Sequence, residues 1–353
     1  MSILAASGAA AAAAATTEPD VVGAVQAAWA VALVIWGLFI AYVLGAFRAA
    51  NLIVPMRLAP TTGVAPVFVL LAVTVFAWLG TQVAFFSFIR YRLPTSETGA
   101  VNIAMLAPAD MAFLGTIPAL VGLAVMMMGD VLVKPTLPRE LGWTLDRVRG
   151  SIWRGLLAMV SVLPLMTGAG ILLQMLYIAV GYAHPREHEM LTVLGKTRDE
   201  VTKIVIVGGA TLLVPIFEEF LFRGHLQTIL VRLFTPRPPG LPAPQGFPVV
   251  QDGDVIPAEG TVATAAMNVP QPPPQEPEAP RDASPAGKWA AIAIASLVFA
   301  VMHPGWTWPL IFLLSLGLGY AYERTGNLWV PVVMHLSFNS AQTAIFLLFH
   351  DSL

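Results

Sequence analysis

Two adjacent glutamates and an arginine stand close together in a very apolar part of the sequence. Glu218, Glu219 and Arg223 follow an apolar run that begins at Ile204. Residues four apart share one face of a helix, so Glu219 and Arg223 should form an ion pair, whereas Glu218 points about 100° away. We predict that Arg223 neutralises and orients Glu219, and that Glu218 is free to act as a general base. The alternative for this segment alone is an ion pair that only fixes helix packing.

A histidine follows a phenylalanine at the same four-residue spacing further along the chain. Phe299 and His303 should lie one helical turn apart, so the phenyl ring can restrict the orientation of the imidazole. Pro304 disfavours helical geometry at the preceding residue, which places His303 at or near the end of its helix. Taken alone, such a histidine is more often a core residue than a catalytic one.

A second histidine precedes an asparagine near the end of the chain. Gly326 and Asn327 interrupt the apolar pattern, and Pro331 fits the first turn of the helix that follows. His335 and Asn339 then share one face of that helix. Both side chains can donate hydrogen bonds to an oxygen that develops negative charge. The alternative is a polar clamp between two helices.

The three elements together supply what peptide hydrolysis by water requires. A glutamate base, two histidines and an asparagine on three different helices can activate a water molecule and stabilise a tetrahedral oxyanion. Glu218, His303 and His335 are also residue types that bind zinc. The His-Glu-x-x-His pattern of many zinc proteases is absent, however, and Arg223 lies beside Glu218. A metal-free mechanism is slightly favoured, and the sequence leaves zinc open as a cofactor.

The composition predicts that these residues lie in a membrane. Hydrophobic residues make up 57% of the 353-residue chain and charged residues 11%, with a mean hydropathy of +0.74. A soluble domain carries about 25% charged residues. The 19 lysines and arginines are scattered singly, which argues against nucleic-acid binding. The chain has no cysteine, which excludes disulfides and thiolate nucleophiles.

Eight apolar segments approach the length of about 20 residues that a membrane crossing needs. The predicted fold class is therefore all-α, with about eight transmembrane helices. The predicted segments are Val21–Phe47, Val64–Ile89, Ile103–Met128, Ile152–Val180, Lys203–Phe234, Trp289–His303, Leu310–Tyr322 and Leu328–Phe349.

The chain divides into parts by composition. Residues 1–20 are predicted to be a disordered lead, 21–200 to hold about four transmembrane helices, and 201–353 to hold the three motifs. The segment 235–287 contains 14 of the 29 prolines. Such a stretch buries too little apolar surface to offset its ordering entropy, so we expect a disordered extramembrane loop.

The distribution of basic residues suggests an orientation. The connection Lys134–Arg154 is the most basic short loop, and the positive-inside rule places it in the cytoplasm. With eight crossings, the proline-rich loop 235–287 would face the same side. Basic residues in other loops, such as Arg90 and Arg186, count against this orientation. We expect a multi-pass protein of the inner (plasma) membrane of a bacterium, with membrane lipid and a protein or peptide substrate as its partners.

The order Glu-Glu-x-x-x-Arg, Phe-x-x-x-His, His-x-x-x-Asn resembles the family of CAAX prenyl endopeptidases and bacteriocin-processing enzymes, the CPBP intramembrane proteases. The resemblance covers roughly Val201–Phe349. A weaker similarity extends upstream, from Leu141-Gly142-Trp143 to Gly155. The resemblance to the family implies an eight-helix fold around a polar, water-filled intramembrane cavity. The proline-rich insertion between the first two motifs departs from the family pattern.

The resemblance also implies a role for each motif residue. Glu218 would activate water with the assistance of His303. Glu219 and Arg223 would form and orient the site. His335 and Asn339 would form the oxyanion hole.

Two other functions compete with an endopeptidase. A non-catalytic membrane binding or immunity protein could keep the same fold, although all six motif positions are filled. A proton-coupled transporter could use Glu218 and the histidines as a relay, but the two halves show no convincing inverted repeat. Asp130 and His225 are assigned no function, because Asp130 is expected near the end of its span and His225 is expected to approach the membrane interface.

Overall fold

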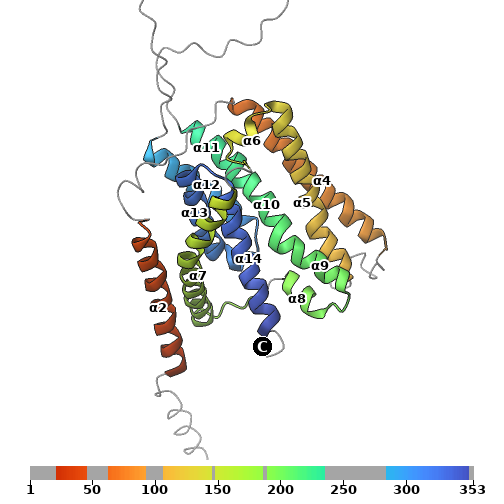
Figure 1. The fold of residues 1–353 in the computed structure, drawn as a ribbon. Coiled ribbons are helices and arrows are strands. Elements are labelled where there is room, and N and C mark those ends of the chain that lie inside the picture. Colours follow the sequence, from red (N-terminus) through yellow and green to blue (C-terminus); the bar gives the residue numbers. More distant parts are fainter. Residues whose placement is uncertain are drawn as a thin grey trace, which may run out of the picture.

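The computed structural model describes residues 21–45, 63–92, 106–144, 148–185, 189–234 and 284–349. Every regular element in these ranges is a helix (Figure 1). The predicted lead 1–20 and residues 235–283 of the predicted loop lie outside them. Six helical segments are long and apolar enough to cross a membrane, so the chain is an integral membrane protein. They are Gly23–Val43, Val64–Tyr91, Pro108–Val133, Val148–Ala179, Glu200–Leu233 and Trp329–Phe349.

The other two predicted segments are also helical but shorter. α12 (Pro285–Val301) has 17 residues and α13 (Trp308–Thr325) has 18, and neither is among the six. α12 begins before the predicted Trp289. The Ser284 hydroxyl caps it by accepting a hydrogen bond from the Gly287 amide, and proline fits the first helical turn.

The helices pack as pairs around one interrupted central helix. α2 (Val21–Val43) packs along α7 (Val148–Ala179), α4 (Val64–Arg92) packs along α5 (Pro108–Val133), and α14 (Trp329–Phe349) lies against α7. The short helices α6 (Leu137–Glu140) and α8 (Glu189–Lys196) lie in the connections.

The central helix consists of α9 (Glu200–Gly208), the π-helix η3 (Gly209–Leu213), α10 (Val214–Glu219), the π-helix η4 (Phe220–Gln227) and α11 (Thr228–Leu233). In Figure 1 it passes between the α4–α5 pair and the group formed by α7, α12, α13 and α14. The first predicted motif therefore lies on the element that contacts both groups.

The described ends of the proline-rich insertion lie side by side. A Cβ atom added to Gly287 would lie 3.0 Å from the Cβ atom of Phe234. The end of α11, the start of α12 and the short α6 gather at one end of the helical bundle (Figure 1). The insertion thus leaves and re-enters the bundle at one place. The basic connection after α5 begins at the same end. That it and the insertion face one side of a membrane stays a prediction.

The upstream residues that resemble the family hold the start of α14. Gly142 has φ +78°, and its carbonyl accepts a hydrogen bond from the Leu328 amide at 3.3 Å. A Cβ atom there would collide with the backbone of Gly326. The ring of Trp143 stacks on that of Trp329, with ring centroids 3.8 Å apart. This turn therefore fixes the helix that carries His335.

A second glycine on α7 allows α14 to approach closely. A Cβ atom on Gly155 would lie 2.7 Å from the side chain of Val333. Val333 precedes His335 by two residues. The close approach of α7 at Gly155 therefore sets the distance between α7 and the part of α14 that carries His335. Small residues at helix contacts of membrane proteins permit such close backbone approach.

Candidate active site

Glu219 and Arg223 form the predicted ion pair in the centre of the bundle. A guanidinium nitrogen lies 3.2 Å from Oε1 of Glu219, and the two side chains are 1% and 0% exposed. A buried charge without a partner is costly, so each residue compensates the charge of the other. The i, i+4 spacing brings them together within one helix.

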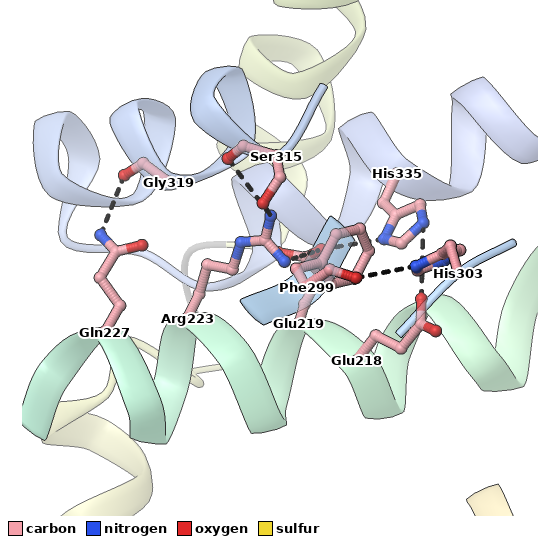
Figure 2. A network of polar contacts seen from close by, with 9 residues as sticks. All are labelled: Glu218, Glu219, Arg223, Gln227, Phe299, His303, Ser315, Gly319 and His335. Carbon is pink, nitrogen blue, oxygen red and sulfur yellow. Dashed lines mark hydrogen bonds and ion pairs between the residues drawn. The ribbon is translucent and has the colours of Figure 1, made fainter. Parts of the chain in front are cut away.

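Arg223 also joins the central helix to two other helices. It donates to the Ser315 hydroxyl at 2.7 Å and to the Ser315 backbone carbonyl at 3.3 Å, both on α13. Its guanidinium carbon lies 4.7 Å from the centre of the Phe299 ring on α12. The cation is therefore fixed by a carboxylate, a serine and an aromatic face (Figure 2). Sequence analysis missed Ser315, because a serine in an apolar helix carries no pattern of its own.

His335 lies between the two glutamates. Its Nδ1 is 2.9 Å from Oε1 of Glu219, and its Nε2 is 3.7 Å from Oε2 of Glu218. Figure 2 shows the imidazole facing both carboxylates across the gap between α14 and the central helix. The side chain of Glu218 is 19% exposed and that of His335 is 4% exposed. Glu218 is thus the more accessible of the two glutamates.

His303 is held by its own helix end, as its proline neighbour predicts. α12 ends at Val301, and Nδ1 of His303 donates to the Phe299 carbonyl at 2.8 Å. A carbonyl only accepts hydrogen bonds, so this nitrogen carries the proton and Nε2 of a neutral ring has a free lone pair. The indole of Trp308 donates to the His303 carbonyl at 2.7 Å. The ring therefore has a defined tautomer and a fixed backbone.

Phe299 connects the two histidines. Its ring centroid lies 4.7 Å from that of His303 and 5.8 Å from that of His335. The resemblance implied that Glu218 is assisted by His303. Among the described residues, the short contact of Glu218 is with His335, and His303 reaches this group through Phe299.

Asn339 contacts the backbone of the central helix. Its amide donates to the Ala210 carbonyl at 2.9 Å. Ala210 lies in η3, where the Val214 amide bonds five residues back to Gly209. The next amide in that pattern would belong to Pro215, which has no N–H, so the Ala210 carbonyl needs another donor. Asn339 supplies it with one of its two amide hydrogens.

The structure therefore brings four of the six predicted site residues into direct contact. Glu218, Glu219, Arg223 and His335 form one network, His303 joins it through Phe299, and Asn339 lies one turn along α14 from His335 and bonds to Ala210.

The predicted zinc alternative does not fit this arrangement. Among the described residues, no three histidine, aspartate or glutamate side chains form a group that could hold a metal ion. Glu218, His303 and His335 thus do not form a zinc set here.

Comparison with protein families gives one match. Residues 278–341 match the family of Rce1-like type II CAAX prenyl endopeptidases. The matched range contains His303, His335 and Asn339, whereas Glu218 and Arg223 lie upstream of the insertion. Neither the curated proteins nor the solved structures include a match to this chain.

The segment that matches the family contacts the first motif, which lies outside the matched range. The matched segment carries the second and third motifs, and His335 of that segment contacts both glutamates of the first motif. The upstream residues that resemble the family hold α14 in place. Residues 278–341 are therefore similar to a family of membrane proteases, and this match supports the resemblance to the CAAX prenyl endopeptidases and bacteriocin-processing enzymes.

Proposed function

We propose that this protein is an intramembrane endopeptidase that hydrolyses a peptide bond of a membrane-associated protein or peptide. The observation that carries the proposal is the placement of His335 between Glu218 and Glu219. One carboxylate is fully buried and tied to Arg223, while the other is partly exposed. Two adjacent acids thus have different environments, which is how enzymes assign two carboxyl groups to different tasks.

Glu218 is the base in this proposal. It carries no hydrogen bond to Arg223 and keeps accessible surface, so a water molecule can reach it. Deprotonation of that water by Glu218 gives the nucleophile, and the proton later passes to the leaving amine. His303 assists through Nε2, the nitrogen that its bond to Phe299 leaves free.

His335 stabilises the tetrahedral oxyanion. Its Nδ1 is held by Glu219, which fixes the orientation of the ring. With both ring nitrogens protonated, Nε2–H can donate to the developing oxyanion, and the two neighbouring carboxylates complement the positive charge of the ring. The second amide hydrogen of Asn339 is the additional donor. Glu219 and Arg223 hold His335 in position.

We also propose that α12 and α13 complete eight crossings around a polar cavity that opens to Glu218. The substrate enters this cavity from the bilayer, and its chemical class includes prenylated peptides of the CAAX type. The expected location is the inner membrane of a bacterium. The family match over residues 278–341 and the exposed part of the Glu218 side chain support these assignments.

The test compares wild-type protein with Glu218→Gln, both purified in detergent and incubated with prenylated and plain quenched-fluorescent peptides. Glutamine keeps the shape of glutamate but cannot take the proton, so cleavage should fall by about 10²- to 10⁴-fold. Glu200→Gln is the matched control, because Glu200 lies on the same central helix but pairs with Lys203 at the surface. A chelator arm tests metal dependence, and we expect activity to survive it.

Equal cleavage by wild type and Glu218→Gln would contradict the role of Glu218. A wild type that binds peptides but cleaves none across a broad library would instead favour a non-catalytic membrane binding protein.

A further inference from the structure

A second buried acid–histidine pair lies outside the proposed catalytic network. Nε2 of His225 is 2.8 Å from Oδ1 of Asp130, and both side chains are 0% exposed. Sequence analysis expected Asp130 near the end of its span and His225 near the membrane interface. Asp130 does lie in the last turn of α5, but both side chains are buried, and they join η4 of the central helix to α5.

The hydrogen bonds of His225 determine how many protons the pair holds. Nδ1 lies 2.9 Å from the Phe220 carbonyl, which only accepts, so Nδ1 must carry a proton. The bond between Nε2 and Asp130 needs one more proton, on either the ring or the carboxyl group. The pair therefore holds two protons and no net charge. A neutral pair is the form that a buried, water-free site tolerates.

The pair acts on the turn that follows the catalytic glutamates. Phe220 is the residue directly after Glu219, and His225 is five residues further on, the spacing of a π-helical turn. The ring of Phe220 also packs edge-on against Trp143, at a centroid distance of 4.4 Å. Thr228 makes a similar link, because its hydroxyl donates to the Arg223 carbonyl five residues back, at 3.2 Å. Side chains thus close the wide turns of η4.

We propose that Asp130 and His225 are positioning residues, which hold the π-helical turn after Glu219 in place against α5. His225 fixes the Phe220 carbonyl, and Asp130 fixes His225. Through this chain, α5 sets where Glu218 and Glu219 stand relative to His335. The catalytic consequence rests on the proposed peptidase function, whereas the local structural consequence does not.

Asparagine and glutamine at position 225 separate the two bonds of the imidazole. The short amide of asparagine places its N–H near the position of Nδ1 and can keep the bond to Phe220. The longer amide of glutamine reaches toward Nε2 and keeps the bond to position 130. Both are made in an Asp130→Asn background, so that no buried charge is left unpaired. Asp130→Asn alone is the conservative control, because its amide can donate to Nε2 of a neutral His225.

The first readout is hydrogen exchange of the amides in Phe220–Gln227, measured on the full chain in detergent. We expect Asp130→Asn alone to match wild type, because it keeps both bonds of His225. Asp130→Ala, Asp130→Asn/His225→Asn and Asp130→Asn/His225→Gln each lose one of the two bonds. They should exchange about tenfold faster in this segment, with α2 unchanged. Wild-type exchange in all four variants would overturn the proposal.

The second readout is peptide cleavage. We expect kcat to fall by up to about 100-fold in Asp130→Asn/His225→Gln with KM unchanged, because a small misplacement of catalytic groups has such effects. Asp130→Asn alone should stay within a few-fold of wild type. Faster exchange with unchanged kcat would overturn the catalytic positioning. If wild type cleaves no peptide, the proposed function fails, and hydrogen exchange still decides the role of the pair.

Discussion

The contact between α2 and α7 and the contact between α14 and the central helix hold their helices in different ways. α2 meets α7 through small residues: a Cβ atom on Gly37 would lie 2.8 Å from the Ser161 carbonyl, and one on Gly168 would lie 2.5 Å from the Ala30 carbonyl. The Ser161 hydroxyl donates to the Gly37 carbonyl at 2.8 Å. α14 instead meets the central helix through charged and polar side chains, centred on His335.

This difference separates assembly in the membrane from the organisation of a site. Close backbone approach at glycine allows helices to pack without any defined polar group. A buried carboxylate, by contrast, needs a particular partner at a particular distance. We therefore expect substitutions in the first contact to affect stability alone, and substitutions in the second to affect stability and catalysis together.

The largest effect on stability is expected from Arg223→Met. This change leaves Glu219 buried without its cation, and such losses cost about 3–5 kcal/mol. Thermal unfolding in detergent measures the effect, with the exposed Arg198→Met as the control. Glu219→Gln in the Arg223→Met background should restore part of the loss, because it removes the unpaired charge. A fully stable Arg223→Met protein would contradict the importance of the pair.

A smaller effect is expected from Asn339→Ala, which leaves the Ala210 carbonyl without a donor. A buried unsatisfied carbonyl costs about 1–3 kcal/mol, and the partly buried Ala210 carbonyl should lie at the lower end of this range. Pro215→Ala restores an N–H at the position that fails to bond to Ala210. The double variant should therefore be more stable than Asn339→Ala alone in an unfolding experiment. If Pro215→Ala gives no recovery, the proline is not the reason that Asn339 is needed for stability.

The same substitution in the two glycine contacts of α7 tests the comparison directly. Gly155→Val should displace Val333 and the adjoining part of α14, and so reduce stability and cleavage together. Gly37→Val, which faces Ser161, should destabilise the α2–α7 contact by about 1–3 kcal/mol, as overpacking does, and leave kcat unchanged. Unfolding temperature and kcat are measured for both. A loss of kcat in Gly37→Val would show that α2 also organises the site.

The smallest effect concerns Asp199, which caps the start of the central helix outside the membrane-spanning segment. Its carboxylate accepts hydrogen bonds from the Thr202 side chain and amide, which lower the pKa of Asp199 below its ordinary value. Its contribution to stability is therefore present above the ordinary pKa and is lost as the pH falls through the lowered one. Asp199→Asn keeps the cap but cannot titrate.

Unfolding of both proteins is measured from neutral pH to about pH 2, through and below the ordinary pKa of an aspartate. Wild type should lose slightly more stability than Asp199→Asn below the ordinary pKa. Parallel curves would contradict a contribution from this carboxylate.

Local features of the site could be predicted from the sequence, because they depend on neighbours a few residues away. The Glu219–Arg223 pair follows from helical spacing, and the helix end at His303 follows from Pro304. The apolar composition predicted a helical membrane protein. Six of the predicted segments are helices long and apolar enough to cross a membrane.

Only the tertiary structure decided which distant groups meet. The helices are apolar on nearly all sides, so their sequences do not indicate which face turns toward which neighbour. Three contacts join residues on separate helices. They are those of His335 with the two glutamates, of Ser315 with Arg223, and of Asp130 with His225. The hydrogen bond from Asn339 to Ala210 further depends on a π-helical stretch, which the spacing of residues in the sequence does not predict. Spacing along the chain fixes partners within one helix, whereas packing of glycines and polar atoms fixes partners between helices.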